Sequence, residues 1–383
     1  MTETTKPFVV PSRDSISRGN VAGDSSRAPS ETTGETTVET TVIVPFHRNL
    51  SQLSACLAAI RRAAPGAELI VAADGALDDC RPLAAAHRAR VIEIDGPQGP
   101  AAARNHAAAV ATGEVLIFVD TDVVVAEDAI ERLSGYLAAN PGVAGVFGAY
   151  DEEPPERNFS SRYRNLSHSY VHQRAHTRAL TFWGGLGALR ADAFNAIGGF
   201  DERFRRPCVE DIDLGYRLSM AGYELRVEAA ARGRHLKRWT LLGGVVSDVR
   251  DRGVPWTQLI LRSGLLANDL NTSTALRVSL VLSYVLVGAL LAAPFLPTAW
   301  AIGALAVAGG GLAALVALNW EYYRWFQRRE GTGFAVRVIA VHILHHLCNG
   351  VSLAWGAMLT FASRRGIQLP GALPAGPWTG HVR

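Results

Sequence analysis

The chain contains little cysteine and almost no net charge. Its 383 residues include four cysteines, too widely spaced for a disulfide framework or a zinc cluster, namely Cys56, Cys80, Cys208 and Cys348. Lysine and arginine number 38 against 35 acidic residues, and a net charge of +3 excludes a dedicated nucleic-acid-binding protein. Charged residues make up only 19% and hydrophobic ones 48%, which indicates a membrane protein. The scattered cysteines indicate that its soluble part is reduced and faces the cytoplasm.

The first 38 residues lack apolar clusters and are rich in Ser, Thr, Gly and Glu. Such a segment cannot bury enough surface to offset the entropy lost on ordering, so we predict a disordered tail over residues 1–38. No apolar run long enough for a signal peptide precedes residue 41.

Short β-branched runs alternate with amphipathic ones over the next eighty residues. The pattern predicts strands at 40–46, 68–74, 89–95 and 114–120, and helices at 53–63, 81–88 and 101–112. This alternation is typical of an α/β domain with a Rossmann-like, mainly parallel sheet and helices on both faces. We place the domain at residues 39–262 and expect its ligand at the carboxyl ends of the strands.

A run of 43 residues without Asp, Glu, Lys or Arg lies at 278–320. Pro294 and Pro297 divide it into two segments that are each near the length needed to cross a bilayer, so we predict a transmembrane hairpin. A third apolar segment at 338–363 contains three histidines and either spans or dips in and returns. The predicted membrane region is therefore 263–363, followed by a short tail at 364–383.

Arginines flank the hairpin on both sides, whereas its turn is uncharged. Arg262 and Arg277 precede it, and Arg324, Arg328 and Arg329 follow it. Because short cytoplasmic loops are enriched in basic residues, both flanks should be cytoplasmic. The sequence thus predicts a multi-pass protein of the inner membrane with a cytoplasmic domain.

The fourth predicted strand ends in the stretch VDTD, in which a single residue separates two carboxylates. Asp120 and Asp122 could share a divalent cation, since hard oxygen ligands suit Mg²⁺ or Mn²⁺. Such a cation could bridge a diphosphate and neutralise the charge that develops on a leaving nucleotide. The alternative is a turn followed by a helix cap.

A second acidic group, in VEDIDLGYRL at 209–218, opens a predicted helix. Glu210, Asp211 and Asp213 would be favoured there by the helix dipole alone. The functional alternative is that one of them accepts a proton from an attacking hydroxyl.

Five segments, in this order, resemble the motif set of family 2 glycosyltransferases with a GT-A fold. They are TTVIVPFHRN, LIVAADGALDD, GPAAARNHAAAVATGEVLIFVDTD, FWGGLGALRADAFNAIGGFDERF and VEDIDLGYRL, and the resemblance covers about residues 41–239. The resemblance implies inversion at the anomeric carbon, a nucleotide-diphosphate sugar donor and a divalent metal, Mn²⁺ or Mg²⁺. Together with the hairpin, it suggests an acceptor that is lipid-linked or otherwise held at the membrane.

The resemblance also implies roles for residues of the nucleotide pocket. Pro45 and His47 would line it, Asp74 would contact the base, and Arg104 would lie near the nucleotide or its phosphates. Many members have two consecutive acids where this chain has Ala73 and Asp74, which leaves the base open. Asp74 could instead only shape a turn, and Arg104 could be a solvated helix residue.

The remaining implied roles are metal binding, contact with the sugar, and proton transfer by a general base. Asp120 would lie by the ribose or the metal, and Asp122 would bind the metal with His235 as a third ligand. Asp211 matches the general base of the family. A glycine-rich loop would lie beside donor sugar and acceptor, at Gly184 and Gly185.

Two other functions fit parts of the same sequence. The DTDVV stretch also resembles the aspartate loop of phosphatases, but that chemistry needs a downstream lysine and a loop on the first strand. The chain has only Lys6 and Lys237, and its loop follows the fourth strand. A catalytically inactive membrane scaffold is the second alternative, against which the joint presence of Asp120, Asp122 and Asp211 argues.

Overall fold

The computed structural model describes residues 38–175, 177–266 and 273–373, all within the second of two units, residues 37–383. The tail predicted for residues 1–38 lies, except for Val38, outside the described residues. The same holds for positions 374–383 of the predicted C-terminal tail.

One mixed sheet forms the centre of the α/β domain, with strand order β3-β2-β1-β4-β8-β6-β9-β5 and β7 paired to β9. The first four strands are mutually parallel, as the alternating pattern predicts. Two of them have the predicted bounds. The four are β1 (Thr40–Phe46), β2 (Glu68–Asp74), β3 (Arg90–Ile94) and β4 (Val115–Val119).

The second half of the sheet is not parallel, because β8 (Leu186–Arg190) runs antiparallel to both β4 and β6 (Val143–Tyr150). The chain enters β8 from a loop at the carboxyl end of β4 and then runs back along β4. The loop therefore lies at the edge of the sheet where the parallel strands end. The other strands are β5 (Val123–Val125), β7 (Arg178–Ala179) and β9 (Glu224–His235).

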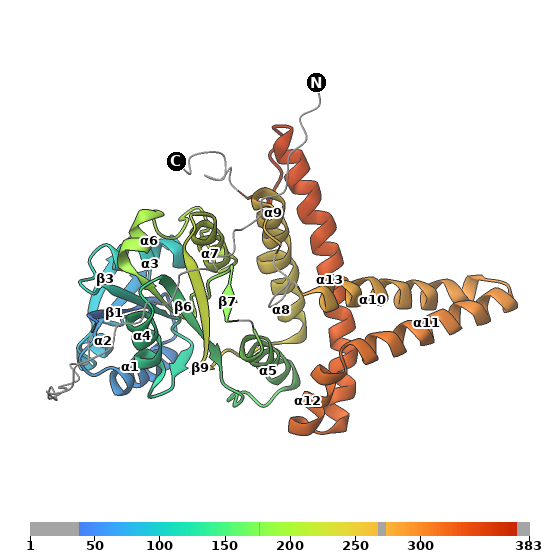
Figure 1. Cartoon of the computed structure of the whole chain (residues 1–383), viewed down its shortest axis with the longest axis horizontal. Coiled ribbons are helices and arrows are strands. Elements are labelled where there is room, and N and C mark those ends of the chain that lie inside the picture. Colours follow the sequence, from blue (N-terminus) through green and yellow to red (C-terminus); the bar gives the residue numbers. More distant parts are fainter. Residues whose placement is uncertain (1–37, 176, 267–272, 374–383) are drawn as a thin grey trace, which may run out of the picture. The chain divides into compact units, whose positions relative to one another are not determined.

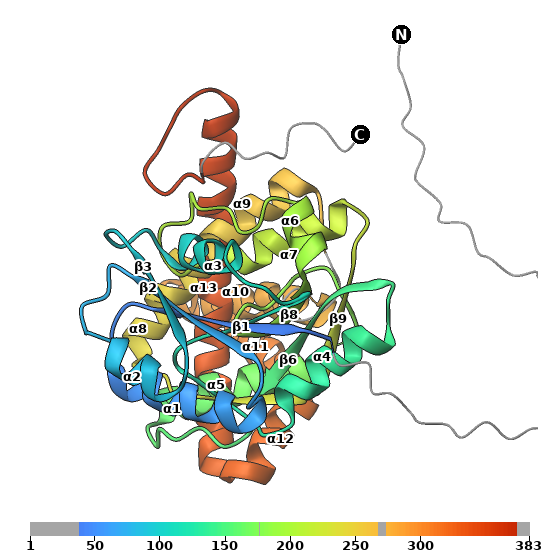
Figure 2. The ribbon, with the colours of Figure 1, turned by 90° about the vertical axis from the view of Figure 1, so that its left-hand side faces the viewer.

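Helices cover both faces of the sheet, as predicted (Figure 2). Alternate residues of β1 enter opposite cores: Val42 and Val44 pack with α1, α2 and α4, and Ile43 packs with α3, α6 and α7. The first group is α1 (Leu50–Ala63), α2 (Arg81–Ala86) and α4 (Ala129–Ala139), and the second is α3 (Pro100–Ala108), α6 (Ala191–Ala196) and α7 (Glu210–Met220).

The predicted hairpin is present as α10 (Thr274–Ala292) and α11 (Thr298–Leu318), joined by the short helix η3 (Ala293–Phe295) (Figure 1). Both prolines lie at the turn, Pro294 within η3 and Pro297 before α11. Helix α12 (Trp320–Glu330) follows and leads into the 33-residue α13 (Thr332–Arg364). Three of the described helices are long and apolar enough to cross a membrane, α10 with η3, α11 and α13.

A buried ion pair connects the α/β domain to the helices that precede the hairpin. Arg164 donates two hydrogen bonds, of 2.9 and 2.6 Å, to the carboxylate of Asp248. Burial alone would raise the pKa of Asp248, but hydrogen bonds from His345 and Arg164 hold it well below its usual range. The pair joins α5 (Phe159–Gln173) to the π-helix η1 (Ser247–Gly253), which lies between α8 (Leu241–Val246) and α9 (Val254–Ser263).

Asp248→Asn should therefore lower the free energy of unfolding by about 3–5 kcal/mol, because Arg164 stays buried without a counter-charge. The thermal midpoint in detergent measures this loss. Asp128→Asn is the matched control, since its pair with Arg132 is exposed and its loss should leave the midpoint almost unchanged. Equal midpoints for the two variants would contradict the assigned role of the buried pair.

Candidate active site

The structure brings together two of the predicted metal ligands from distant parts of the chain. Asp122 follows β4, and His235 ends β9, where β5 and β9 pair with Val123 opposite His235. The His235 Nε2 lies 3.3 Å from the Asp122 Oδ2. Antiparallel pairing of two short strands thus places a carboxylate and an imidazole at one edge of the sheet.

The His235 ring is held from two sides by residues that the sequence analysis missed. Its Nδ1 lies 2.8 Å from the Asn165 Oδ1, and the ring stacks on Tyr150 with centroids 4.5 Å apart. Because the Asn165 oxygen only accepts, Nδ1 carries the proton and Nε2 faces the carboxylate of Asp122. Neither residue lies in a motif, so no local signal pointed to them.

A lone pair on Nε2 and a carboxylate oxygen 3.3 Å apart need a proton or a cation between them. Burial would raise the pKa of Asp122, but the contact with His235 lowers it overall, which keeps the carboxylate in the form that binds metal. No group of three His, Cys, Asp or Glu side chains converges among the described residues. Two protein ligands suit a cation that is also bound by substrate phosphates, as is usual for Mg²⁺ and related ions.

Asp120, the other acid of the stretch, is paired with a buried arginine. Arg104 Nη2 donates to the Asp120 Oδ1 at 2.6 Å, and Nη1 donates to the Glu210 Oε1 at 3.0 Å. Arg104 is only 3% exposed, and its guanidinium lies 5.1 Å from the centre of the Phe200 ring. The alternative of a solvated helix residue is therefore wrong.

The two neighbouring acids at the start of α7 occupy different environments. Glu210 is paired with Arg104 and also accepts from the Cys208 amide at 2.8 Å. Asp211 accepts from the amides of Gly184 at 3.1 Å and Ile212 at 2.8 Å, without a cation of its own. Burial and the charge of Glu210 raise the pKa of Asp211 to about 7, a value suited to taking up a proton near neutral pH.

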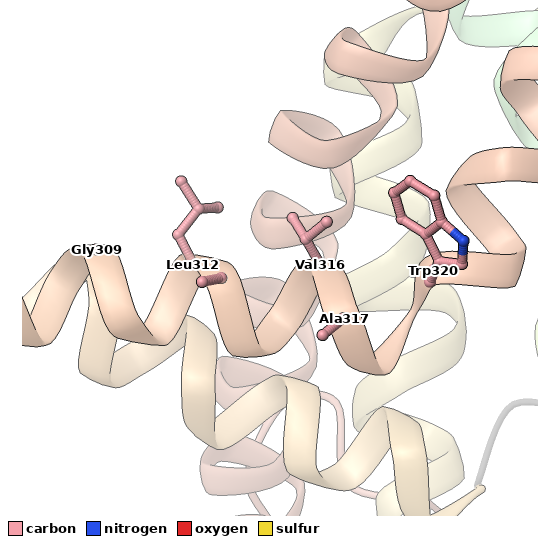
Figure 3. A pocket seen from close by; sticks show the side chains of 6 residues that line it. Gly309, Leu312, Val316, Ala317 and Trp320 are labelled. Atoms are coloured by element: carbon pink, nitrogen blue, oxygen red, sulfur yellow. The ribbon is translucent and has the colours of Figure 1, made fainter.

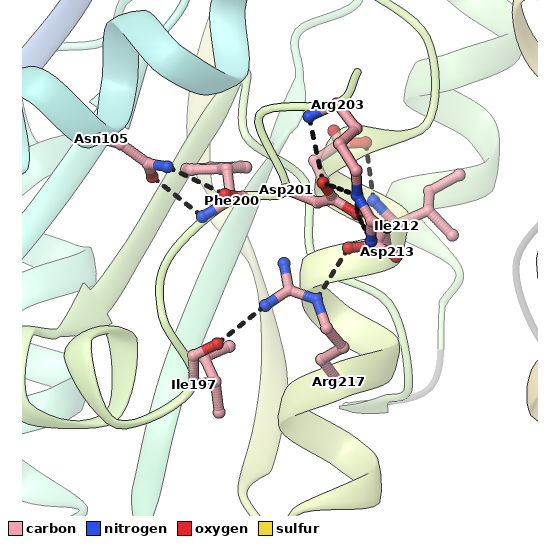
Figure 4. A network of polar contacts seen from close by, with 9 residues as sticks. Asn105, Ile197, Phe200, Asp201, Arg203, Ile212, Asp213 and Arg217 are labelled. Atoms are coloured by element: carbon pink, nitrogen blue, oxygen red, sulfur yellow. Dashed lines mark hydrogen bonds and ion pairs between the residues drawn. The ribbon is translucent and has the colours of Figure 1, made fainter. Parts of the chain in front are cut away.

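A polar network joins α3 and α7 to the segment between α6 and α7, as Figure 4 shows. Asn105 donates to the Phe200 carbonyl at 2.8 Å and accepts from the Phe200 amide at 2.9 Å. Arg217 donates to Asp213 at 2.8 Å and to the Ile197 carbonyl at 3.0 Å. Asp213 is thereby buried in an ion pair, which leaves Asp211 as the acid that faces the site.

Three of the predicted nucleotide-pocket residues, Pro45, His47 and Asp74, lie together at the ends of β1 and β2, whereas Arg104 lies on α3. Asp74 accepts from the amides of Gln98 and Gly99, both at 2.7 Å, and its carbonyl oxygen is 2.9 Å from the His47 Nδ1. Asp74 thus shapes a loop. Each of its carboxylate oxygens accepts one of these bonds and keeps a lone pair for a further donor. The contact of Asp74 with a nucleotide base stays a prediction. The Pro45 carbonyl accepts from the Thr121 hydroxyl, which joins β1 to the Asp120–Asp122 loop.

Residues 41–198 match the family described as glycosyl transferase family 2. Residues 41–198 thus form a glycosyltransferase family 2 domain. Residues 164–238 also match a family described as the N-terminal domain of galactosyltransferase. The two matches together cover β1 to β9 and thus every site residue described above.

Two relatives of named function resemble the same half of the chain. Pre-mycofactocin glycosyltransferase of Mycobacterium tuberculosis is 31% identical over 225 residues, which are 56% of this chain and 46% of that protein. Validoxylamine A glucosyltransferase of Streptomyces hygroscopicus subsp. jinggangensis is 26% identical over 231 residues, 50% of this chain and 54% of that protein. The chain thus spans about half the length of these relatives.

One solved structure resembles most of the chain. It is the mannosyltransferase PcManGT from Pyrobaculum calidifontis in complex with GDP-Man and Mn²⁺, with a TM-score of 0.53 and 18% identity. The alignment covers 83% of this chain and 87% of that one. This likeness confirms the predicted GT-A-like fold.

Residues of α11 and the first residue of α12 line an open apolar hollow that includes none of the acidic-site residues (Figure 3). Its large lining side chains are Leu312, Val316 and Trp320, and the others are small. Its full lining is Gly309, Leu312, Ala313, Val316, Ala317 and Trp320. A surface of this composition on an apolar helix suits hydrocarbon and offers no group for catalysis.

The glycine loop that precedes β8 connects the two acidic motifs of the glycosyltransferase. The Gly185 carbonyl accepts from the Asp120 amide at 3.1 Å, and the Gly184 amide donates to Asp211. A Cβ at Gly185 would lie 2.8 Å from the Trp183 ring, whereas one at Gly184 would lie 3.4 Å from the Arg104 guanidinium carbon and 3.5 Å from the Asp211 Cβ.

Gly185→Ala should therefore displace the Trp183 indole and cost about 1–3 kcal/mol of stability, as overpacking usually does. Gly184→Ala is the matched control and should change stability by less than about 1 kcal/mol. The thermal midpoints of the two purified variants compare them directly. A larger loss for Gly184→Ala would mean that the loop is packed differently.

Proposed function

We propose that the chain is an inverting glycosyltransferase that moves a sugar from a nucleotide-diphosphate sugar to an acceptor at the membrane. The observation that carries the proposal is the electrostatic division of the site. Asp122 and His235 form one group suited to a cation, and Asp211, whose pKa is raised, lies on the other side of the Arg104 ion pairs. The family match of the domain supports the same reaction class.

The chemistry is a displacement at the anomeric carbon. The acceptor hydroxyl attacks that carbon and forms the new C–O bond while the bond to the diphosphate breaks, and Asp211 takes the hydroxyl proton. A divalent cation held by Asp122 and His235 would neutralise charge on the departing diphosphate. Arg104 holds Asp120 in place through a 2.6 Å hydrogen bond, and the Gly184 amide orients Asp211.

Lys237 is a further candidate for the diphosphate. Burial and Arg252 lower the pKa of Lys237, while Asp122 opposes this shift. Its Nζ lies 4.3 Å from the centre of the Trp239 ring, against which Arg164 also packs. A partly desolvated ammonium near Asp122 is suited to an anionic group of the donor.

The arginines at the two flanks of the hairpin support a catalytic domain in the cytoplasm. A nucleotide-sugar donor would reach the domain from that side. The hairpin supports an acceptor that is lipid-linked or held at the inner membrane. The relatives are named for pre-mycofactocin and validoxylamine A. An assay should therefore include membrane-held acceptors and also acceptors of the kinds for which these relatives are named.

The glycosyltransferase reaction is tested with a panel of nucleotide sugars in the presence of Mn²⁺ or Mg²⁺. The wild type should release nucleoside diphosphate with at least one donor and should release no phosphate from p-nitrophenyl phosphate. A phosphatase would show the reverse, and an inactive scaffold would show neither product and no metal-dependent nucleotide binding.

Asp122→Asn should lower metal-dependent nucleotide binding and turnover by about 100-fold or more, because the cation loses its charged ligand. His235→Ala should raise the Mn²⁺ concentration needed for half-maximal activity by a smaller factor. Titration calorimetry with nucleotide and Mn²⁺ measures binding, and Asp128→Asn is the control with an exposed carboxylate. Unchanged metal dependence in Asp122→Asn would refute the assignment.

The rate should also rise with pH through about 7, as Asp211 loses its proton and becomes able to act as the base. Asp211→Asn should lower transfer by about 10²–10⁴-fold and spare donor affinity. Glu210→Gln removes the like charge beside Asp211, so the midpoint of the acidic limb should move to lower pH. The pH dependence of kcat/KM for the three proteins measures both effects.

Two outcomes would count against Asp211 as the base. One is a loss of donor affinity in Asp211→Asn with transfer preserved, which would make it a binding residue. The other is an acidic limb that persists unchanged in Asp211→Asn, which would assign the titration to another group.

A further inference from the structure

We propose that α13 does not span the membrane but lies in its plane, with one face on the glycosyltransferase and the other in the headgroup region of the bilayer. This inference concerns the surface that contacts lipid, so it holds or fails separately from the proposed reaction. It addresses the third apolar segment of the sequence, which composition alone makes a candidate span.

Both ends and the middle of α13 contact the catalytic half of the chain. Near its start, the Arg337 guanidinium lies 4.7 Å from the Phe159 ring centre of α5. In its middle, the His345 Nδ1 lies 3.2 Å from the Asp248 carboxylate. At its end, Arg364 donates to the Leu261 carbonyl of α9 at 2.9 Å. A spanning helix has its ends on opposite sides of the bilayer, which these three contacts with one domain do not allow.

Close backbone approaches make this contact continuous. A Cβ on Gly253 would lie 2.3 Å from the Ser352 hydroxyl, and a Cβ on Gly356 would lie 2.6 Å from the Thr257 side chain. The two glycines, one on each side of the interface, let α13 pack directly against η1 and α9. Glycine at such a position permits an approach that any side chain would block.

The elements that pack along α13 are too highly charged for hydrocarbon. η1 alone contributes four ionisable side chains within seven residues, namely Asp248, Arg250, Asp251 and Arg252. A single charge at the centre of a bilayer costs at least about 2.5–3.5 kcal/mol. If α13 spanned the membrane with its contacts intact, it would bring η1 in with it.

The length and direction of α13 also favour a helix that lies in the plane of the membrane. Its 33 residues are about 50 Å long at 1.5 Å per residue, against a hydrocarbon thickness of about 30 Å. In Figures 1 and 2 it runs crosswise to the α10–α11 hairpin. The two meet where the Tyr284 hydroxyl of α10 donates to the Leu347 carbonyl at 2.8 Å. A hairpin that crosses the bilayer thus holds α13 along its surface.

The face of α13 that points away from the catalytic half is suited to the bilayer surface. It exposes large apolar side chains and is continuous with the apolar hairpin, and arginines stand at both its ends. Apolar and aromatic residues flanked by basic ones are typical of helices that lie at an anionic membrane surface. The exposed apolar side chains are Val336, Val351, Leu353, Trp355, Met358 and Phe361.

The first test determines on which side of the membrane the end of α13 lies. Green fluorescent protein, which fluoresces in the cytoplasm, and alkaline phosphatase, which is active outside it, are fused in turn after Arg383 of the full chain. We expect fluorescence and no phosphatase activity. The same reporters inserted after Leu296 in the hairpin turn are the control and should give the opposite pair of signals. Phosphatase activity after Arg383 would mean that α13 spans, and would overturn the proposal.

The second test distinguishes an in-plane helix from one that dips into the bilayer and returns. Single spin labels at positions 336, 351 and 358 are placed in a full-length chain without its native cysteines, reconstituted in phosphatidylethanolamine–phosphatidylglycerol vesicles. Collision with oxygen and with a nickel chelate should report one shallow depth, about 5–10 Å, for all three. A label at Leu305 of α11 is the deep control. A label at 351 as deep as the control would overturn the proposal.

Discussion

The site depends on one buried cation. Arg104 is almost fully enclosed, and two carboxylates from different elements compensate its charge, Asp120 after β4 and Glu210 at the start of α7. A buried guanidinium without partners would cost several kcal/mol, so this requirement fixes how α7 lies against the sheet. Asp211 follows Glu210 directly, and its position is therefore set by the pairing of its neighbour.

A second buried ion pair, between Arg164 and Asp248, connects the site to α13, the helix that we place at the membrane. Three consecutive contacts connect the metal candidate to α13 through α5: Asn165 holds the ring of His235, Arg164 beside it binds Asp248, and Asp248 contacts His345. Of these contacts, the Arg164–Asp248 pair is both charged and buried, and charge-assisted hydrogen bonds are stronger than neutral ones. The catalytic edge and the in-plane helix are thus connected by two adjacent residues of one helix.

Much of the fold follows from local patterns, whereas the partners of the site residues do not. The strands at 40–46 and 68–74 were predictable because alternating β-branched residues enter two cores. The reversal at β8 was not, since a strand's direction depends on the loop that precedes it and leaves no period in the sequence. Asp122 and His235 were predictable through the family resemblance, but Asn165 and Tyr150 are ordinary residues of a helix and a strand. Only tertiary packing gives them contact with His235.

The two adjacent acids show why residue type alone does not assign a role. Glu210 and Asp211 differ by one methylene and are neighbours, yet a helix turns about 100° between them, so each meets different groups. The one that faces Arg104 is held in a buried ion pair with it and has a structural role. The other is buried beside the negative charge of Glu210, which disfavours its charged form and raises its pKa, although the hydrogen bond from the Gly184 amide opposes this rise. One buried arginine that can pair with only one of two neighbours thus produces both a fixed anion and a group able to exchange a proton near neutral pH.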